Sequence, residues 1–330
     1  MNMGKEILRI EDLSVHFFTY AGVVRAVEDL NLTIMKGEVF ALVGETGCGK
    51  SMTMRAVLRL IPPPGRIVKG RIIFDGIDLL KLSEEEMRKI RGSEIAMIFQ
   101  DPNTALDPLF TAGYQVVETL TAHNKKIKIK EAWRRTLKLF KLVDIPEAEK
   151  RLRSYPHELS GGMKQRVVIS IALSLNPKLL IADEPTTALD VTIQAQILKL
   201  LKELQEKYNV TLVMITHNLG VVAEMADRVA VMYAGSIVEV ADVFKLFENP
   251  LHPYTKGLLG AIPSTARKVS RLTPIPGTVP NMINPPPGCK FHPRCKYARD
   301  ICKVKRPELI EVRPGHLVAC HLYGERCKWS

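Results

Sequence analysis

Residues 159–190 read LSGGMKQRVVISIALSLNPKLLIADEPTTALD. This stretch joins a Ser-Gly-Gly turn at 160–162, which leads directly into a helical pattern, to an apolar strand at 179–182 that ends in Asp183 and Glu184. Unpaired backbone N–H groups and the positive end of the helix dipole make such a turn suitable for a phosphate. The strand is apolar on both faces, which is typical of a parallel strand buried between helices. Carboxylates that follow it lie at the edge where α/β folds bind ligands, so the stretch predicts an α/β fold that handles phosphates.

A second glycine-rich segment lies between an apolar strand pattern at 39–43 and a helical pattern at 50–60. It reads GETGCGKS and fits the P-loop pattern G-x-x-x-x-G-K-[ST] in the strand–loop–helix context that the pattern requires. Its backbone N–H groups are predicted to cradle phosphates, Lys50 to neutralise the β and γ oxygens, and Ser51 to bind Mg²⁺. The predicted ATP-binding residues of this loop are Gly44, Glu45, Thr46, Gly47, Cys48, Gly49, Lys50 and Ser51.

Polar residues at other strand ends complete a candidate hydrolytic site. Asp183 is predicted to bind Mg²⁺ directly or through water, and Glu184 beside it to orient or deprotonate the attacking water. Gln100, after a strand pattern at 95–99, could reach the metal or the water, and His217, after a strand pattern at 210–215, could contact the γ-phosphate. Taken singly, Gln100 and His217 would more often be ordinary polar residues at strand ends.

The remaining patterns predict how the chain is organised. Residues 8–18 and 23–34 predict an antiparallel hairpin around Ala21-Gly22, and residues 101–165 predict a helical insertion that includes a helix at 131–143. After Gly162 helices and strands alternate, which favours a mainly parallel sheet. The further predicted elements are a strand at 71–74, a helix that runs to 175, a helix at 191–207, strands at 229–233 and 236–240, and a helix pair at 243–262. We expect an ATPase domain at 1–262, followed by a Pro-rich linker and a cysteine module at 263–330.

The order of these motifs resembles that of the ATP-binding subunits of ABC transporters. The resemblance covers about residues 8–240 and rests on GETGCGKS, Gln100, LSGGMKQR, LLIADEP, Ala188-Leu189-Asp190 and His217. It implies a P-loop NTPase with an N-terminal antiparallel β subdomain, a helical subdomain insertion and a C-terminal extension that contains cysteines. It further implies that two subunits meet head to tail, so that the signature LSGGMKQR of one closes on the nucleotide held by the P-loop of the other.

The resemblance also implies a role for individual residues at the matching positions. Ser160, Gly161 and Gly162 would bind the γ-phosphate held by the opposite subunit, and Asp190 would lie at the interface. Glu184 would be the catalytic base, His217 the switch residue, and Phe17 the aromatic side chain that stacks on adenine. Phe18 and Tyr20 compete with Phe17 for that last role, and the alternative for Phe17 is a core residue of its strand.

Longer matches narrow the resemblance to the ATPases of oligopeptide and dipeptide importers. They are FQDPNTALDP (99–108), YPHELSGGMKQR (155–166), NPLHPYTKGLL (249–259), PGTVPN (276–281) and GCKFHPRC (288–295). This resemblance implies ATP hydrolysis coupled to peptide uptake, two membrane permease subunits, and a second ATP-binding subunit that is identical or paralogous. It also implies an extracytoplasmic solute-binding protein that acts through the permeases, and a peripheral location on the cytoplasmic face of the membrane. Oligosaccharides and nickel are alternative cargoes for this type of transporter.

Charge and hydropathy are compatible with other functions as well. No apolar stretch approaches the roughly 20 residues that span a bilayer, so any membrane role is expected to need a partner. Residues 263–330 hold 13 Lys and Arg against 4 Asp and Glu, while the rest of the chain is nearly balanced. A basic tail could face nucleic acid, an anionic membrane or an anionic prosthetic group. A nucleic-acid-associated ABC ATPase is therefore a less favoured alternative, and a small-molecule kinase leaves LSGGMKQR unexplained.

Five of the six cysteines lie in the same tail, at positions 289, 295, 302, 320 and 327. The paired C-x₂-C spacing of common zinc sites is missing from this set. The resemblance implies a [4Fe-4S] cluster on Cys289, Cys295, Cys302 and Cys320, with Arg294, Lys296 and Arg299 offsetting its negative charge. Zinc, disulfides and free thiols remain alternatives, as does a purely structural role for any bound group.

Cys48 stands apart from this group, inside the P-loop. A helix N-terminus lowers the pKa of a thiol, so one hypothesis is a reactive Cys48 that ATP protects from alkylation. The simpler alternative is a small side chain that fills space.

Overall fold

The computed structural model describes residues 4–187, 189–261 and 275–324. The chain forms two compact units: residues 1–81 together with 215–330, and residues 82–214. We describe the two units in turn.

The first unit contains the predicted N-terminal hairpin. Strands β1 (Glu6–Thr19) and β2 (Gly22–Met35) pair antiparallel, and β4 (Gly65–Phe74) pairs with the other edge of β1. With the short β5 (Ile77–Asp78) they form a sheet of order β2-β1-β4-β5, which confirms the antiparallel β subdomain. Strand β4 begins at Gly65, earlier than predicted, because Gly65 already pairs with Phe17 directly after the three prolines.

A second sheet of the first unit carries the P-loop. Strand β3 (Val39–Val43) is fully buried and pairs in parallel with β9 (Arg228–Tyr233), which pairs antiparallel with β10 (Ser236–Asp242). The bounds of β3, β9 and β10 agree closely with the strands predicted at 39–43, 229–233 and 236–240. The elements that accompany these strands are η1 (Leu79–Lys81) and the helices α1 (Lys50–Val57), α9 (Leu219–Met225), α10 (Val243–Glu248) and α11 (Pro253–Gly260).

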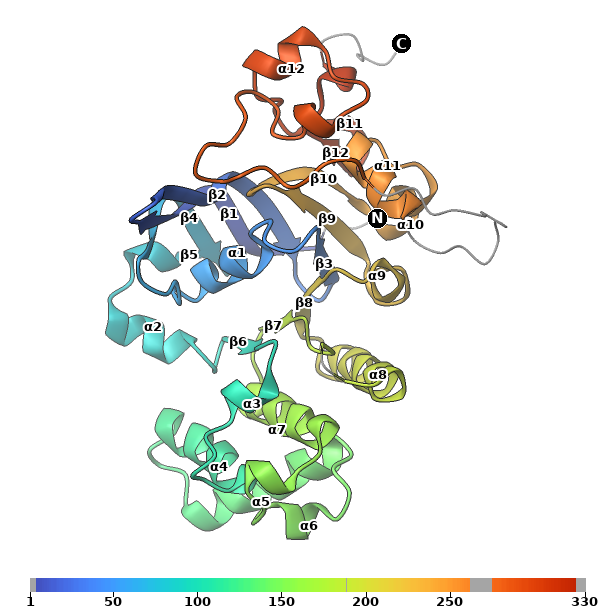
Figure 1. The fold of residues 1–330 in the computed structure, drawn as a ribbon. Coiled ribbons are helices and arrows are strands. Elements are labelled where there is room, and N and C mark those ends of the chain that lie inside the picture. Colours follow the sequence, from blue (N-terminus) through green and yellow to red (C-terminus); the bar gives the residue numbers. More distant parts are fainter. Residues whose placement is uncertain (1–3, 188, 262–274, 325–330) are drawn as a thin grey trace. The chain divides into compact units, whose positions relative to one another are not determined.

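The tail extends this second sheet, which the sequence did not predict. Strand β12 (His316–Val318) pairs antiparallel with β10, and β11 (Ile310–Arg313) pairs with β12 (Figure 1). Three short helical segments, η3 (His292–Arg294), α12 (Asp300–Val304) and η4 (His321–Tyr323), carry the cysteine region. The tail is therefore joined to the ATPase sheet through backbone pairing.

A buried carboxylate holds the tail on this sheet. The Glu239 side chain of β10 is 0% exposed, and its oxygens accept hydrogen bonds from the Leu251 N–H (2.7 Å), the His252 N–H (2.9 Å) and His316 Nε2 (2.7 Å). Burial alone would raise the pKa of Glu239, but the bonds from His316 and the two amides hold it below its ordinary value. Glu239 therefore stabilises the fold fully at pH values above its pKa in the unfolded chain, about 4.3. This stabilisation is lost as the pH falls through the lower pKa that Glu239 has in the folded protein.

Replacing Glu239 with alanine should lower the free energy of unfolding by about 3 kcal/mol at pH 7, because three buried donors lose their acceptor. Denaturant unfolding followed by circular dichroism measures this loss. Glu308→Ala, which removes an exposed tail carboxylate, is the control and should stay within about 0.5 kcal/mol of the wild type. Equal stabilities of the two variants would contradict the role of Glu239 as a buried acceptor that stabilises the fold.

The second unit combines a short parallel sheet with helices. Strands β6 (Ile95–Ile98) and β7 (Leu179–Asp183) pair in parallel, and β8 (Thr211–Thr216) begins in this unit, while its residues from Ile215 on belong to the first unit. Between residues 101 and 165 the structure contains helices and no strand, as predicted. The helical elements of the unit are α2 (Glu84–Ile90), α3 (Pro102–Ala105), α4 (Ala112–His123), α5 (Ile129–Leu142), α6 (Ala148–Arg151), η2 (Pro156–Glu158), α7 (Gly161–Leu173) and α8 (Val191–Tyr208).

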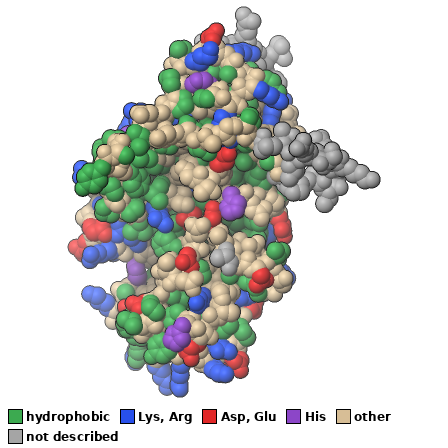
Figure 2. Space-filling view, viewed as in Figure 1, with side chains coloured by type: hydrophobic (Ala, Val, Ile, Leu, Met, Phe, Trp, Pro, Cys, Tyr) green, Lys and Arg blue, Asp and Glu red, His purple; other side chains and the backbone are tan. Residues whose placement is uncertain are grey.

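One face of the second unit is strongly charged. Lys and Arg side chains gather along its lower edge in Figure 2, where α5 and α6 contribute most of the basic residues. Glu131 of α5 pairs with Arg134 and Arg135 within the same helix. Such short-range pairs are typical of a helix face that contacts water. In the described part of the chain, no helix is both long enough and apolar enough to cross a bilayer.

Candidate functional site

The P-loop has the backbone conformation that its glycines predict. Gly44, Gly47 and Gly49 all have positive φ angles (152°, 80° and 104°). A Cβ on Gly49 would lie 2.4 Å from the carbonyl oxygen of Ala26, and one on Gly44 would lie 2.2 Å from that of Met232. Only glycine fits such close backbone approaches, so the loop is held in one shape between β3 and α1.

Lys50, the first residue of α1, is directed back onto this loop. Its Nζ donates to the carbonyl oxygens of Gly44 (2.8 Å) and Glu45 (3.1 Å), and its side chain is 5% exposed. The ammonium group is therefore fixed beside the concave backbone where a phosphate would bind. This placement agrees with the phosphate-binding role of Lys50, which stays a prediction.

The structure corrects the hypothesis of a reactive Cys48. The thiol is 1% exposed, and its burial raises the pKa above the ordinary value despite the neighbouring Lys50 ammonium, 3.7 Å from the sulfur. A neutral, enclosed thiol is a poor nucleophile. The helix N-terminus does not lower the pKa here because removal of water from the sulfur outweighs it, and Cys48 fills space.

Phe17 lies in β1 opposite Gly65 of β4 and is half-buried. A Cβ on Gly65 would lie 2.7 Å from the Phe17 ring, so the glycine makes room for this aromatic side chain. The Phe18 ring points to the guanidinium of Arg66, at 5.8 Å, and Tyr20 is fully exposed. The structure thus leaves an aromatic surface around Phe17, and adenine stacking on it stays a prediction.

The second unit brings two of the predicted catalytic residues into direct contact. Gln100 Nε2 donates to Glu184 Oε2 at 2.8 Å, and Thr187 Oγ1 donates to the same oxygen at 3.0 Å. Asp183, the last residue of β7, is almost completely buried. Glu184 has a φ of 45°, a left-handed conformation that glutamate rarely adopts. Strained residues of this kind concentrate at functional sites, which makes the strand end the candidate catalytic edge of this unit.

The signature turn caps a regular helix, as predicted. Ser160 is the N-cap of α7, its Oγ accepts from the Met163 N–H at 3.3 Å, and Ser160 and Gly161 are both exposed. A Cβ on Gly162 would lie 2.8 Å from Ile193, one turn into α8. Asp190 is the exposed N-cap of α8 and accepts from the Ile193 N–H at 3.0 Å. The signature turn and Asp190 are therefore neighbours, while Ala188 lies outside the described residues.

His217 follows β8 directly and is exposed, next to Asn218, whose side chain caps α9. It belongs to the first unit, as does the P-loop, whereas Gln100, Asp183 and Glu184 belong to the second unit. The roles predicted for His217 and for the three Mg²⁺ ligands, Ser51, Gln100 and Asp183, stay predictions.

Four tail cysteines converge on one small cavity of about 10 Å³, which His292 and His321 also line. The four are Cys289, Cys295, Cys302 and Cys320, and none of them is in a disulfide. Burial raises the pKa of Cys289 and of Cys320 to about 11, and their mutual proximity adds to the shift. Cys327 lies outside the described residues. Among the described side chains, no group of three or more His, Cys, Asp or Glu has an arrangement that could hold a metal ion.

Backbone amides are aimed at these sulfurs. The N–H two residues further on interacts with the sulfur in Cys289, Cys295 and Cys320, and the Arg299 N–H lies 3.5 Å from the Cys302 sulfur. Each interaction favours the thiolate over the thiol, although burial outweighs it in the first three. The four sulfurs, with a backbone N–H group beside each, are therefore suited to act as thiolates. The sulfurs are not arranged as they would be around a single bound metal ion.

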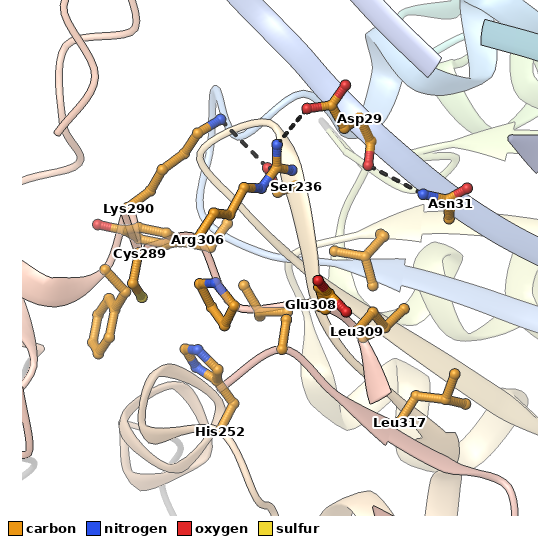
Figure 3. A pocket seen from close by; sticks show the side chains of 16 residues that line it. Asp29, Asn31, Ser236, His252, Cys289, Lys290, Arg306, Glu308, Leu309 and Leu317 are labelled. Carbon is orange, nitrogen blue, oxygen red and sulfur yellow. Dashed lines mark hydrogen bonds and ion pairs between the residues drawn. The ribbon is translucent and has the colours of Figure 1, made fainter. Parts of the chain in front are cut away.

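Three basic residues of the tail, Lys290, Arg294 and Arg306, pair with acidic residues of β2 and of the P-loop. Arg306 pairs with Asp29 (2.7 Å) and also donates to Ser236 Oγ (2.9 Å), as Figure 3 shows. Lys290 pairs with Glu28 (2.9 Å) and lines the same cavity, of about 510 Å³. These pairs account for part of the surplus of basic residues in the tail. From the sequence alone, that surplus could have faced a nucleic acid, a membrane or a prosthetic group.

Arg294 has the least exposed side chain of these three basic residues, and its partner differs from the one expected. It was expected to offset the charge of a cluster, but its guanidinium binds the Glu45 carboxylate of the P-loop at 2.8 and 3.1 Å. Sequence reasoning missed this contact because the two residues are 249 positions apart. The only signal was the excess of basic residues in the tail.

Comparison with known proteins identifies the chain. Residues 27–187 match the family model described as "ABC transporter", and residues 238–302 match that of the "Oligopeptide/dipeptide transporter, C-terminal region". The "Dipeptide transport ATP-binding protein DppD" of Bacillus subtilis (strain 168) is 50% identical over 98% of this chain and 97% of its own length. The "Oligopeptide transport ATP-binding protein OppD" of the same organism is 52% identical over 94% of this chain and 87% of its own.

Solved structures agree with these relatives. The dimeric ATP-binding cassette MJ0796, in a post-hydrolysis state with ADP and Pi, has a TM-score of 0.65 and 28% identity over 72% of this chain and 99% of its own. The fold, the P-loop and the signature helix thus define an ABC-type ATPase. The chain belongs to the ABC transporter family and, within it, to the ATP-binding subunits of oligopeptide and dipeptide transport.

Proposed function

We propose that this chain hydrolyses MgATP as one of two ATP-binding subunits that drive peptide import. The observation that carries the proposal is the pair of phosphate-binding features in one chain: a P-loop with a fixed Lys50, and an exposed Ser-Gly-Gly turn at the N-terminus of α7. The relatives named as dipeptide and oligopeptide transport proteins favour peptides as the cargo over oligosaccharides or nickel.

The proposed roles follow from the chemistry of each residue. Gly44–Ser51 hold the phosphates, and Ser51, Gln100 and Asp183 bind Mg²⁺, which supplies charge neutralisation at the γ-phosphate when it is bound. Glu184, held by Gln100 and Thr187, orients and deprotonates the attacking water. His217 contacts the γ-phosphate from its position after β8, and Phe17 stacks on the adenine ring.

The nucleotide is proposed to lie between two subunits. Ser160, Gly161 and Gly162 of one protomer contact the γ-phosphate held by the P-loop of the other, with Asp190 at the interface. The solved dimer of a related cassette supports this arrangement. An exposed helix N-terminus gains most from an anion when the partner delivers the phosphate to its free N–H groups. ATP then joins the subunits, and hydrolysis releases them.

Two membrane permeases are proposed to dock on the helices of the second unit near Gln100, with the chain on the cytoplasmic face of the membrane. An apolar group supports this docking: Leu109, Phe110 and Tyr114 are exposed around the start of α4, and Leu109 is 78% exposed. The Phe110 and Tyr114 rings stack at 5.1 Å. Preformed aromatic groups of this kind are typical anchors of protein interfaces.

Leu109→Asp should weaken permease binding about tenfold or more, because a charge enters the apolar contact. Pull-down of the permeases from detergent extracts of native membranes, with tagged chain, measures the effect, and the same preparation identifies the permeases, the second ATPase subunit and the solute-binding protein. Ile129→Asp changes another exposed apolar residue, which is 60% exposed at the start of α5, and should leave binding unchanged. Full retention of the permeases by Leu109→Asp would contradict this docking surface.

A [4Fe-4S] cluster on Cys289, Cys295, Cys302 and Cys320 is proposed as a further component of the tail. Supporting it are the convergence of the four thiols on one cavity and the backbone N–H group at each sulfur. The boundary of the tail, proposed at 262/263, falls at residues outside the described ranges.

Purification without oxygen should give brown protein that contains iron and sulfide in about equal amounts. The double variant Cys295→Ser, Cys302→Ser, purified in the same way, should lose both. Colourless wild-type protein without iron would overturn the cluster, and stoichiometric zinc in its place would favour a single-ion site.

A further inference from the structure

The P-loop is held from outside by residues of the C-terminal tail. Arg294, the last residue of η3, lies between two of the clustered cysteines, and its side chain is 6% exposed. It donates to both carboxylate oxygens of Glu45, from NH1 at 2.8 Å and from NH2 at 3.1 Å. Glu45 is the second residue of the P-loop. A two-point pair of this kind fixes the orientation of both partners as well as the distance between them.

Arg294 is itself fixed on every side. Its Nε donates to the carbonyl oxygen of Pro276 at 2.8 Å, and its NH1 also lies 3.4 Å from the hydroxyl oxygen of Tyr233. The guanidinium lies 5.8 Å from the Tyr233 ring centre and 6.0 Å from that of Phe291. An arginine held by an acceptor, an ion pair and two aromatic rings has little freedom to follow a moving partner, so it acts as a rigid support.

The backbone of Glu45 is anchored to the same cluster. Its N–H donates to the hydroxyl oxygen of Tyr254 at 2.9 Å, and Tyr254 of α11 is completely buried. The Tyr254 ring lies 4.7 Å from that of Tyr233 and 5.5 Å from that of Phe291. One aromatic cluster, formed by Tyr233, Tyr254 and Phe291, therefore lies between the cysteine region and both the side chain and the backbone of Glu45.

Glu45 also contacts Lys50, the lysine predicted to bind phosphate, so the position of Glu45 affects that of Lys50. The Glu45 carbonyl oxygen accepts from Lys50 Nζ at 3.1 Å and from the Cys48 N–H at 3.2 Å. A shift of Glu45 would thus move an acceptor of the Lys50 ammonium and change the curvature of the loop. Displacements of this size at a binding group cost much affinity, because the cradle fits phosphate only in one geometry.

We propose that Arg294 is a positioning residue for ATP: through Glu45 it sets the shape of the P-loop and the position of Lys50, so that the cysteine tail forms part of the nucleotide site. The proposal rests on the proposed function, because it takes the P-loop to be the ATP site. It extends that function by making ATP affinity depend on how the tail is docked.

Arg294→Met should raise the KM for MgATP, and the Kd for a fluorescent ATP analogue, about tenfold or more, because it removes a buried, charged two-point contact. The kcat should change less than threefold, since Arg294 touches neither the phosphate nor the attacking water. Arg294→Lys restores one of the two bonds and should recover part of the affinity. Glu45→Gln, which disturbs the pair from the loop side, should raise the KM in the same direction even if Arg294→Met fails to fold.

Arg306→Met is the matched control. Arg306 also docks the tail on the ATPase sheet, but its partners are Asp29, Ser236 and the Glu28 carbonyl oxygen, outside the P-loop. It should leave the KM for MgATP unchanged. Equal KM increases in Arg306→Met and Arg294→Met would show a general effect of tail docking and overturn the proposal, as would a KM for Arg294→Met within twofold of the wild type. A wild-type chain that binds no ATP would instead refute the proposed function.

Discussion

Replacing Glu184 with glutamine should leave MgATP binding intact and lower turnover by about 10²–10⁴-fold, the usual contribution of a general base. Glutamine keeps the shape of glutamate and can still accept the bond from Gln100 Nε2, which lies 2.8 Å from Glu184 Oε2 in the wild type. It cannot take a proton from water. Because ATP would then remain unhydrolysed between two protomers, we also expect a stable dimer in MgATP.

Two measurements check this expectation: phosphate release at saturating MgATP, and the mass in solution by analytical ultracentrifugation. Glu203→Gln, which changes an exposed glutamate of α8, is the control and should behave as the wild type in both. Undiminished hydrolysis by Glu184→Gln would remove Glu184 from the role of catalytic base, and another acidic group would have to supply it.

Gly161→Asp should abolish turnover without weakening ATP binding to the separate subunit. Gly161 is the exposed first residue of α7, where an added Cβ meets only the end of the Leu189 side chain, at 3.3 Å. An aspartate at this position favours the helix, since its charge complements the helix dipole. The same charge repels a γ-phosphate brought by a partner. Loss of the contact between this turn and the phosphate should lower turnover by about 10²-fold or more.

Gly161→Ala is the matched control, because it adds the same first carbon without the charge. It should retain most of the wild-type rate, and the melting temperature of both variants should stay close to that of the wild type. Normal hydrolysis by Gly161→Asp would mean that no phosphate approaches the signature turn.

The sequence predicted most of the ATPase domain because its signals are local. The buried strand at Val39–Val43, the P-loop glycines and the cap at Ser160 each depend on neighbours within a few residues, and each was found where expected. Helix α1 ends at Val57 rather than at residue 60, because Arg59, three residues before the first proline, has a left-handed φ of 53°. Nothing in composition alone marks that residue as a helix end.

The docking of the tail could not be predicted, because it depends on contacts between distant residues. Strands β11 and β12 hold only four and three residues, so they show too little alternation to be recognised. The pair between Arg294 and Glu45 joins two charged residues that are 249 positions apart in the sequence. For Cys48 the sequence left a reactive and a space-filling role open, because burial, which sets the pKa, follows from packing and not from the place of Cys48 in the P-loop.

The most direct test of the account mixes two inactive variants, Lys50→Ala and Gly161→Asp. In a head-to-tail dimer with one subunit of each variant, one site joins the defective P-loop of the Lys50→Ala chain to the defective signature turn of the Gly161→Asp chain. The other site joins the intact P-loop of the Gly161→Asp chain to the intact signature turn of the Lys50→Ala chain. The mixture should therefore recover ATP hydrolysis that neither variant shows alone, at a rate that rises with protein concentration. A mixture as inactive as its components, under conditions where the wild-type chain hydrolyses ATP, would contradict a nucleotide shared between two subunits.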